Sequence, residues 1–599
     1  MAWYDEAVFY HIYPLGLTGA PKQNDYGEPV HRLNTLLPWV DHIKEIGGSA
    51  LYIGPLFESV GHGYETTDYK KLDSRLGTNE DLTAFVAYCH EQGIKVIFDG
   101  VFNHTGRDFF AFKDIQANRE NSQYKDWYCN VNFWGNNEYN DGFSYDNWGG
   151  YNLLVKLNQK NPAVVDYICD VIRFWVSEFD VDGIRLDAAD VLDFDFMKAL
   201  RRTANEVKPD FWLMGEVIHG DYSRWVNGET LHSVTNYTLH KALYSGHNDH
   251  NYFEIAHTVR RLQNMGTLKL YNFVDNHDVE RIYTKLTNKA QFAPVHVLLY
   301  TLPGVPSIYY GSEFGIEGRK EYGSDDSLRP ALNIEDYKDS VKTNPCTALI
   351  AALGKVRQAV PALSYGRYDE LMLTNRQFAY ARDLDGTRVI VSVNNDDAPA
   401  GMHLAAGNCT AYIGALSGEK VSVQDGHINI TQPANSGEIW VPEGTDLDVK
   451  PVKVVTKTES EAKTNTEDKA ASETATDAKG NKGAEPKIES KESKDIVTAT
   501  ESADAKKNTT NTEKNISAAN EVKDSAKDAS AQAAADTPVD PETITVDWSK
   551  SPESMTVPEL QAAILAKLAG NGPVDAQMKK TVTDNIWHDS LVNWLKSFR

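Results

Sequence analysis

Eight short apolar runs recur along the first part of the chain, with helix-length segments between them. The runs lie in AVFYHIYP, SALYIGPLF, KVIFDGVFNH, GIRLDAAD, FWLMGEV, HSVTNY, LYNFVDNHD and VPSIYYGSEF. Short apolar runs bounded by turn residues are typical of buried strands, and strands that alternate with helices favour a parallel sheet. Eight such strands in order predict an α/β fold, a complete TIM (β/α)8 barrel.

A polar segment interrupts this alternation after the third run. Residues 105–158 are rich in Asn, Gly and aromatic residues, and the segment is too long for an ordinary loop between a strand and a helix. We therefore expect residues 1–104 and 159–366 to form the barrel and residues 105–158 to form a small inserted domain.

The periodicity changes after the barrel. Short alternating segments follow within residues 367–447: RQFAYARDL, TRVIVSVNN, TAYIGAL and GEIWVP. A period of two residues predicts half-buried strands, and several of them in succession predict an antiparallel β-sandwich. We interpret this domain as a structural cap on the barrel.

The amino-acid composition changes twice in the last part of the chain. Between Val449 and Asp547 there is no aromatic residue, Leu, Met, Cys, His or Arg. Such a segment cannot bury enough apolar surface to offset the entropy lost on ordering, so residues 448–547 are predicted to be a disordered mixed-charge linker. Residues 548–599 are predicted to be a small helical module.

Two helices are expected in that module. Thr556 is placed to cap a helix with one apolar face, and a second helix carries Trp587 and Trp594 on a shared face. The pattern favours a helical hairpin with both tryptophans in its core. The alternative is a face that docks to an unknown partner or to a glucan.

Charge and cysteine usage limit the partners and the compartment. The net charge of −25 over 599 residues argues against nucleic acid or an anionic membrane surface as partner. No apolar stretch approaches the roughly 20 residues that span a bilayer, and the start of the chain lacks the pattern of a signal peptide. The five cysteines are odd in number and scattered, which predicts reduced thiols in a cytoplasmic protein.

Three carboxylates each follow one of the predicted strands: Asp187, Glu216 and Asp278. Acids at the carboxyl ends of barrel strands converge on one site, although one such acid alone would more often be a helix cap or a loop residue. Two carboxyl groups about 5 to 5.5 Å apart suffice for a retaining glycosidase, as nucleophile and proton donor. Arg185 lies two residues before Asp187, on the same strand face, where we expect its charge to keep that carboxylate ionised.

The residues around these acids carry a resemblance to a known family. DGVFNH, GIRLDAAD, GEVI and FVDNHD resemble, in order, the four signature regions of the α-amylase family of glycoside hydrolases. The resemblance covers about residues 1–445. It implies double-displacement hydrolysis of α-1,4-glucosidic bonds in starch, maltodextrin or related α-glucans, with residues 105–158 as one wall of the substrate cleft.

The resemblance also implies a role for each residue that matches a motif. It makes Asp187 the nucleophile, Glu216 the general acid/base and Asp278 the transition-state stabiliser. Charges on the two aspartates are expected to raise the pKa of Glu216. The substrate-binding residues that it implies are Tyr64, His104, Arg185, His277 and Arg329, with Tyr64 as a platform that stacks on a sugar. His219 is a further candidate for sugar binding, on the leaving-group side.

No cofactor is required by this chemistry, but calcium stays open. Asn103 matches a calcium ligand of typical α-amylases. A polar Asn needs no metal to explain it. Taken alone, His104 and His277 would likewise be structural histidines, and Tyr64 would be part of the wall.

Three activities follow from the resemblance. YKDWY, HDVERIYT and the stretch from GEVIHGD to VTNY are similar to the cyclomaltodextrinase, neopullulanase and maltogenic amylase group. That group normally carries an amino-terminal β domain, which we expect this chain to lack, and its absence favours an open cleft and α-amylase-like hydrolysis. The alternatives are a cyclomaltodextrinase or neopullulanase type of hydrolase, a 4-α-glucanotransferase on the same site and, more distantly, an inactive glucan-binding or assembly protein. Val191 cannot hydrogen-bond a sugar, which predicts weak binding on the leaving-group side.

Overall fold

The computed structural model describes most of the chain up to residue 449 and parts of its end. These are residues 2–266, 268–321, 324–447, 449, 546, 548, 550–552, 555–569, 579, 582 and 595. The chain divides into two units, Met1–Lys506 and Lys507–Arg599. Apart from Val449 and Val546, the predicted linker lies outside the described residues.

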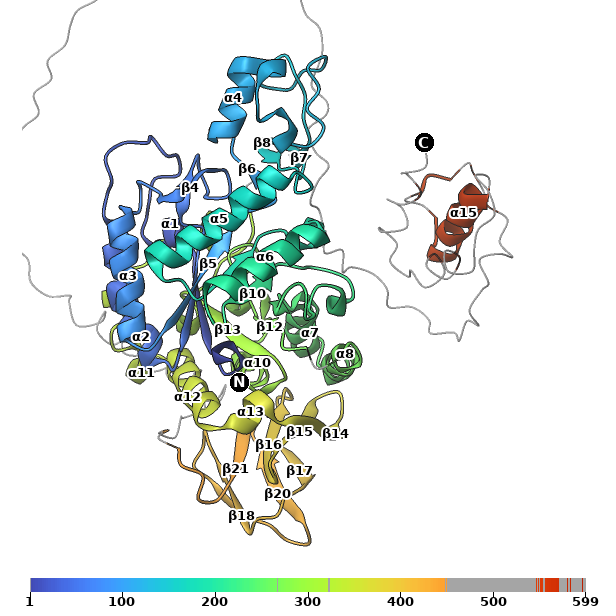
Figure 1. The fold of residues 1–599 in the computed structure, drawn as a ribbon. Coiled ribbons are helices and arrows are strands. Elements are labelled where there is room, and N and C mark those ends of the chain that lie inside the picture. Colours follow the sequence, from blue (N-terminus) through green and yellow to red (C-terminus); the bar gives the residue numbers. More distant parts are fainter. Residues whose placement is uncertain are drawn as a thin grey trace, which may run out of the picture. The chain divides into compact units, whose positions relative to one another are not determined.

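Eight parallel strands form a closed barrel in the first unit (Figure 1). They are β1 (Phe9–Ile12), β2 (Ala50–Ile53), β5 (Lys95–Gly100), β9 (Gly183–Leu186), β10 (Trp212–Gly215), β11 (Ser233–Val234), β12 (Tyr271–Asn272) and β13 (Val305–Tyr309). The sheet order is β11-β10-β9-β5-β2-β1-β13-β12, and a parallel bridge between Thr235 and Tyr271 joins the two edge strands. All eight predicted strands are confirmed in the predicted order.

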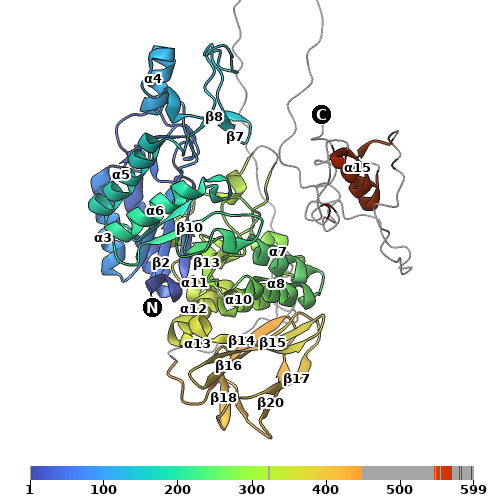
Figure 2. The same cartoon turned by 45° about the vertical axis from the view of Figure 1, so that its right-hand side comes forward.

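Helices surround this barrel (Figures 1 and 2). The longer ones are α2 (Leu37–Glu45), α3 (Asn79–Glu91), α5 (Pro162–Phe179), α6 (Phe194–Val207), α7 (Tyr237–Asn248), α8 (Tyr252–Asn264), α10 (Phe292–Thr301) and α12 (Pro345–Ala359). Short helical turns are α1 (Pro14–Leu17), α9 (Ile282–Lys285), α11 (Ser340–Thr343) and α13 (Pro361–Tyr365). None of the helices in the described part of the chain combines the length and apolarity that crossing a bilayer requires.

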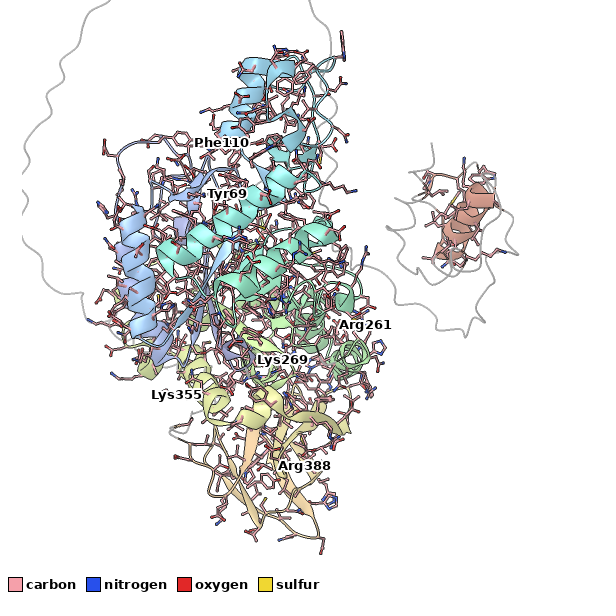
Figure 3. All side chains as sticks on the ribbon, in the orientation of Figure 1. Tyr69, Phe110, Arg261, Lys269, Lys355 and Arg388 are labelled. Carbon is pink, nitrogen blue, oxygen red and sulfur yellow. The ribbon has the colours of Figure 1, made fainter. Side chains whose placement is uncertain are left out.

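Helix α5 illustrates why these segments fold as they do. Asn161 caps its start by accepting a hydrogen bond from the Ala163 amide, and Pro162 occupies the first turn. Trp175 on its inner face stacks on Phe57 with ring centroids 4.4 Å apart. The Trp175 indole donates to the backbone oxygen of Tyr69 (2.7 Å), a residue that Figure 3 labels beneath this helix. The helix is thereby fixed to the barrel wall.

The segment after β5 forms the predicted inserted domain. It contains α4 (Phe110–Asn118) and a three-stranded antiparallel sheet of β6 (His104–Thr105), β8 (Tyr151–Lys156) and β7 (Asn147–Trp148). Gly149 and Gly150 form the tip of the β7–β8 hairpin with φ of 63° and 85°, a backbone conformation that favours glycine. A second hairpin, β3 (Phe57–Ser59) with β4 (Thr66–Leu72), follows β2.

The predicted sandwich is confirmed below the barrel (Figure 1). One sheet has the order β14 (Arg367–Leu373), β15 (Gln377–Leu384), β16 (Thr387–Asn394), β21 (Ser436–Pro442), β18 (Ala411–Gly414) and β19 (Lys420–Ser422). The other pairs β17 (Ala400–Ala405) with β20 (His427–Gln432). Arg388, labelled in Figure 3, donates to the carboxylates of Asp383 (2.8 Å) and Asp369 (2.9 Å) on neighbouring strands.

The second unit contains the first of the two helices predicted for the terminal module, α15 (Val557–Ala569). Leu560 and Ile564 are buried on its apolar face, and Thr556 donates its backbone N–H to Glu559 (2.7 Å) at the start. Of the predicted second helix only Lys579, Val582 and Leu595 are described, and Val582 and Leu595 are buried in the same core as α15. Trp587 and Trp594 lie outside the described residues.

Candidate active site

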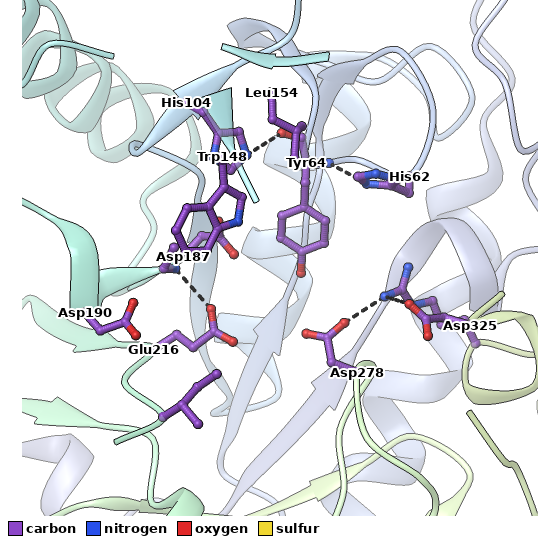
Figure 4. Close-up of a pocket in the computed structure, with 13 residues that line it drawn as sticks. His62, Tyr64, His104, Trp148, Leu154, Asp187, Asp190, Glu216, Asp278 and Asp325 are labelled. Atoms are coloured by element: carbon purple, nitrogen blue, oxygen red, sulfur yellow. Dashed lines mark hydrogen bonds and ion pairs between the residues drawn. The ribbon is translucent and has the colours of Figure 1, made fainter. Parts of the chain in front are cut away.

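A cavity of about 320 Å³ opens at the carboxyl ends of the barrel strands (Figure 4). Its size is that of a small-molecule site. The lining residues are His62, Tyr64, His104, Trp148, Leu154, Asp187, Ala188, Asp190, Glu216, Ile218, Asp278, Asp325 and Arg329. All three predicted catalytic acids therefore face one cavity, although up to 91 residues of sequence separate them (187 to 278).

Arg185 lies under two of these acids. It is the third residue of β9, and its Nη1 donates to Asp187 Oδ1 (2.9 Å), as the shared strand face predicts. Its Nη2 lies 2.9 Å from Glu216 Oε2, which also accepts the backbone N–H of Ala188 (3.0 Å). The same guanidinium donates to Asp99 (2.8 Å) at the end of β5. One cation thus orients carboxylates from three neighbouring strands.

Burial and mutual repulsion set the protonation of Asp187 and Glu216. Burial raises the pKa of Asp187 well above its usual range, although Arg185 acts to lower it. Burial also raises the pKa of Glu216, with Arg185 opposing and the Asp278 charge adding to the rise. The rise at Glu216 follows the prediction. Arg185 lowers the pKa of Asp187 as expected, but burial acts in the opposite direction.

These two carboxyl groups titrate as a pair. They share Arg185, and ionisation of Glu216 raises the pKa of Asp187. Between its two ionisation steps such a pair holds one proton. That state contains one carboxylate and one carboxylic acid, the combination that glycosidic bond cleavage needs.

Asp278 lies in a different electrostatic environment. It follows β12, and Arg329 contacts its Oδ1 (2.8 Å) while His277 Nε2 lies 3.1 Å from its Oδ2. Burial would raise the pKa of Asp278, but the His277 and Arg329 charges outweigh it and lower the pKa to about 2. Asp278 is therefore ionised at any pH at which Asp187 and Glu216 together hold one proton.

Two tyrosine rings lie nearly parallel to the imidazole of His277. The Tyr64 and Tyr13 ring centroids are each 5.8 Å from it, with planes within 12° of parallel. The Tyr64 hydroxyl donates to Asp99 Oδ2 (3.2 Å) and contacts His277 Nε2. Tyr64 thus has a ring that lines the cavity (Figure 4) and a hydroxyl held by Asp99 and His277.

His104 also lines the cavity, but the protein already engages both of its ring nitrogens. Its Nε2 lies 3.1 Å from the Tyr64 backbone oxygen and its Nδ1 3.1 Å from the Asn103 amide nitrogen. Burial lowers the pKa of His104 to about 3, so it is neutral at ordinary pH. Its predicted contact with a sugar stays a prediction.

The calcium ligand implied at Asn103 has one observation in its favour. Its Oδ1 is buried without a hydrogen-bond partner, which is the one feature that fits a ligand. Calcium requires six to eight oxygen ligands, usually with several carboxylates. Among the described residues, no group of three or more Asp, Glu, His or Cys side chains is arranged to hold a metal ion.

The remaining predicted residues differ in position. Arg329 lies in the cavity, where it also contacts Asp325 (3.0 Å). His219 is exposed and is not among the lining residues, although it acts to lower the pKa of Asp190. Val191 directly follows Asp190 in the sequence and is 37% exposed.

Sequence reasoning missed several residues of the site. Asp99 begins the DGVFNH motif at a strand end, so the rule that located the other acids would have located it too. Trp148 and Leu154 come from the inserted domain, and Asp325 comes from the loop after β13. No local pattern marks these three, because only the tertiary fold brings their segments over the barrel.

Comparisons with known proteins agree with this geometry. Residues 32–355 match the family model described as "Alpha amylase, catalytic domain". A cyclomaltodextrinase from Bacillus sp is 31% identical over 422 residues, which cover 66% of this chain and 74% of that protein. Neopullulanase 2 from Thermoactinomyces vulgaris is 29% identical, over 73% of this chain and 78% of that protein. A solved cyclomaltodextrinase structure superposes with a TM-score of 0.65 at 26% identity, covering 73% of this chain and 78% of that one.

Proposed function

The chain belongs to the α-amylase family of glycoside hydrolases, which act on α-glucans, and we propose that it cleaves their α-1,4-glucosidic bonds with retention of configuration. The observation that carries this proposal is the single Arg185 guanidinium bonded to both Asp187 and Glu216 at the floor of the cavity. It holds a nucleophile and a proton donor close enough to flank one glycosidic bond, with Asp187 on the face opposite the leaving group and Glu216 beside the glycosidic oxygen.

In the first step, Asp187 attacks the anomeric carbon. Its Oδ1 is held by Arg185, which leaves the other oxygen to form the covalent bond. Glu216 gives its proton to the departing glycosidic oxygen, so that the leaving chain departs as a neutral alcohol. In the second step Glu216 takes a proton from water, and that water displaces Asp187 from the anomeric carbon.

Asp278 acts in the transition state of each step. An oxocarbenium-like ring carries positive charge and flattens, and an ionised carboxylate stabilises that state more than the ground state. The pKa of about 2 keeps Asp278 charged for this role. Tyr64 offers its ring face to the same sugar, and its hydroxyl is held by Asp99.

Two alternative specificities remain for this site. The names of the relatives, cyclomaltodextrinase and neopullulanase 2, favour opening of cyclodextrins or cleavage of pullulan as the second candidate. Transfer of the glycosyl group to a sugar instead of water uses the same acids, with a sugar hydroxyl in place of water. The complete set of acids argues against an inactive binding protein.

The product profile tests the proposal. Purified protein is incubated separately with soluble starch, pullulan and β-cyclodextrin, and the products are separated by chromatography. We expect short maltooligosaccharides of retained α-configuration from starch. Rapid opening of cyclodextrin, or panose from pullulan, would favour the second candidate.

The matched variants are Glu216→Gln and Glu313→Gln. Glu313 is also a buried glutamate near the end of a barrel strand, but it does not line the cavity. Loss of products with Glu216→Gln alone would support the assignment. Equal loss in both variants, or none in either, would contradict it.

We also propose that the reaction needs no metal ion, because no group of three or more Asp, Glu, His or Cys side chains in the described part of the chain is arranged to hold one. Dialysis against a chelator is therefore expected to leave the initial rate within about two-fold. A large loss that added calcium restores would contradict this.

We propose a cytoplasmic location and leave the partner of the terminal module open. Cys89, Cys129, Cys169, Cys346 and Cys409 are all free, as expected in a reducing compartment. Cell fractionation tests the location. Recovery of the protein from the medium or the membrane fraction would contradict it.

A further inference from the structure

Arg281 is a fully buried arginine three residues after Asp278. Its Nη1 donates to the Tyr310 backbone oxygen and to Ser312 Oγ (2.9 Å), and its Nη2 donates to the Leu328 backbone oxygen (2.9 Å). Desolvating a guanidinium is costly unless its donors find acceptors. Because the guanidinium donors have a fixed geometry, Arg281 joins several segments of the chain at once.

One of these acceptors, the Leu328 backbone oxygen, lies in the loop that carries Arg329. Leu328 directly precedes Arg329, and its backbone oxygen accepts a second hydrogen bond from the Tyr309 hydroxyl (3.0 Å). On the other side, the Tyr310 hydroxyl donates to the Pro330 backbone oxygen (2.9 Å). The backbone is therefore fixed immediately before and after Arg329.

Arg329 in turn fixes Asp278. Its Nε donates to the His277 backbone oxygen (2.9 Å), and its Nη2 donates to Asp278 Oδ1 (2.8 Å). Arg281 belongs to the same strand-end segment as Asp278, and its own backbone N–H bonds Gly318 (3.1 Å). The two segments are thus joined twice, by Arg329 at the cavity and by Arg281 below it.

We propose that Arg281 is a positioning residue for the reaction, which holds the loop bearing Arg329 in register with Asp278 so that the carboxylate meets the flattened sugar ring in the transition state. It touches no substrate. The inference rests on the proposed function, because it concerns how Asp278 acts in that reaction. A displacement of about 1 Å in a catalytic group can cost about 100-fold in rate.

A purely structural role would lower stability without a selective effect on kcat. Arg357 provides the matched control, since it is equally buried and also donates to two backbone oxygens, those of Tyr300 (2.8 Å) and Gly304 (2.7 Å). Arg357, Tyr300 and Gly304 do not line the cavity. Arg357→Lys therefore removes a similar bonding arrangement away from Asp278.

The experiment compares kcat and KM for a maltooligosaccharide, together with thermal unfolding, for the wild type, Arg281→Lys, Arg357→Lys and Tyr309→Phe. We expect Arg281→Lys to lower kcat about 10-fold with KM within about two-fold, because the loss falls on the transition state. Tyr309→Phe removes the second donor to Leu328 and the contact of that hydroxyl with Tyr310, and it is expected to lower kcat about three-fold in the same way. Arg357→Lys is expected to change kcat by less than about two-fold even if unfolding shifts.

The outcomes distinguish failure of the positioning role of Arg281 from failure of the proposed function. An active wild type with equal kcat in the two lysine variants would overturn the positioning role. A change in KM alone would overturn it as well, because it would place the effect on ground-state binding. An inactive wild type would overturn the proposed function itself. If Arg281→Lys does not fold, an unchanged kcat in Tyr309→Phe overturns the inference and a lowered kcat supports it.

Discussion

At Asp278, burial and charge act in opposite directions on one carboxyl group. Burial alone would raise its pKa, but His277 and Arg329 bring it to about 2. Asp187 and Glu216 follow strands that lie three and two positions from β12 around the barrel, yet burial raises the pKa of both. The difference lies in the number of cations each acid receives, since the pair shares one guanidinium whereas Asp278 has its own.

Removing the charge of Asp278 should therefore move the pH profile as well as the rate. The Asp278 carboxylate raises the pKa of both Glu216 and Asp187, so Asp278→Asn lowers both. Glu216 then loses its proton at lower pH, and both limbs of the kcat/KM profile shift to lower pH. We expect kcat to fall about 100-fold or more, as for loss of an electrostatic stabiliser. An unshifted residual profile would contradict the coupling.

Tyr64 combines a ring that faces the cavity with a hydroxyl bonded to Asp99. Tyr64→Phe keeps the ring and removes a hydrogen bond to a charged group, worth about 1.5 kcal/mol, which is about 10-fold in kcat/KM. Tyr64→Ala also removes an aromatic contact of about 1 kcal/mol, for about 50-fold in total. Steady-state kinetics on maltotetraose measures both. Equal losses in the two variants would mean that the ring itself contributes nothing.

At the scale of elements, the β7–β8 hairpin carries the inserted domain to the cavity. Trp148 lines the cavity, whereas Tyr151, its partner across the Gly149–Gly150 turn, is 60% exposed. Trp148→Ala should raise KM for a long maltooligosaccharide about 3- to 10-fold, because an aromatic contact contributes about 0.5 to 1.5 kcal/mol. Tyr151→Ala is the control and should leave KM unchanged. Similar KM values for both variants would assign the effect to the hairpin as a whole.

Local periodicity was sufficient for many elements of this fold but not for all of its site. The eight barrel strands and four of the eight sandwich strands (β15, β16, β18 and β21) were predicted because each is a short run with its own pattern of apolar residues. The acids were found because they follow barrel strands. The contact between Arg329 and Asp278 spans 51 residues, and the loop from Asp325 to Arg329 has no regular period that would place it. Burial was also invisible in the sequence, which is why its effect on the pKa of Asp187, opposed to that of Arg185, was not predicted.

At the scale of the whole molecule, the catalytic groups lie entirely in the first unit. The barrel, the inserted domain and the sandwich all precede residue 448, and α15 in the second unit has a buried core of its own. Chemistry at the cavity needs only groups that contact the sugar. A chain that ends at residue 447 should therefore keep kcat/KM on maltotetraose within about two-fold, because no residue of the site is removed.

Granular starch distinguishes the two interpretations of the terminal module. If the module binds glucan, it raises the concentration of the barrel at the granule surface, and the chain ending at residue 447 loses activity on granules but not on maltotetraose. If Trp587 and Trp594 form a hairpin core, the shortened and full chains digest granules equally. We expect equal rates, because two tryptophans seven residues apart on an otherwise apolar helix face favour a packed core. A selective loss on granules, measured as reducing ends released from equal masses of starch, would instead favour the glucan-binding face.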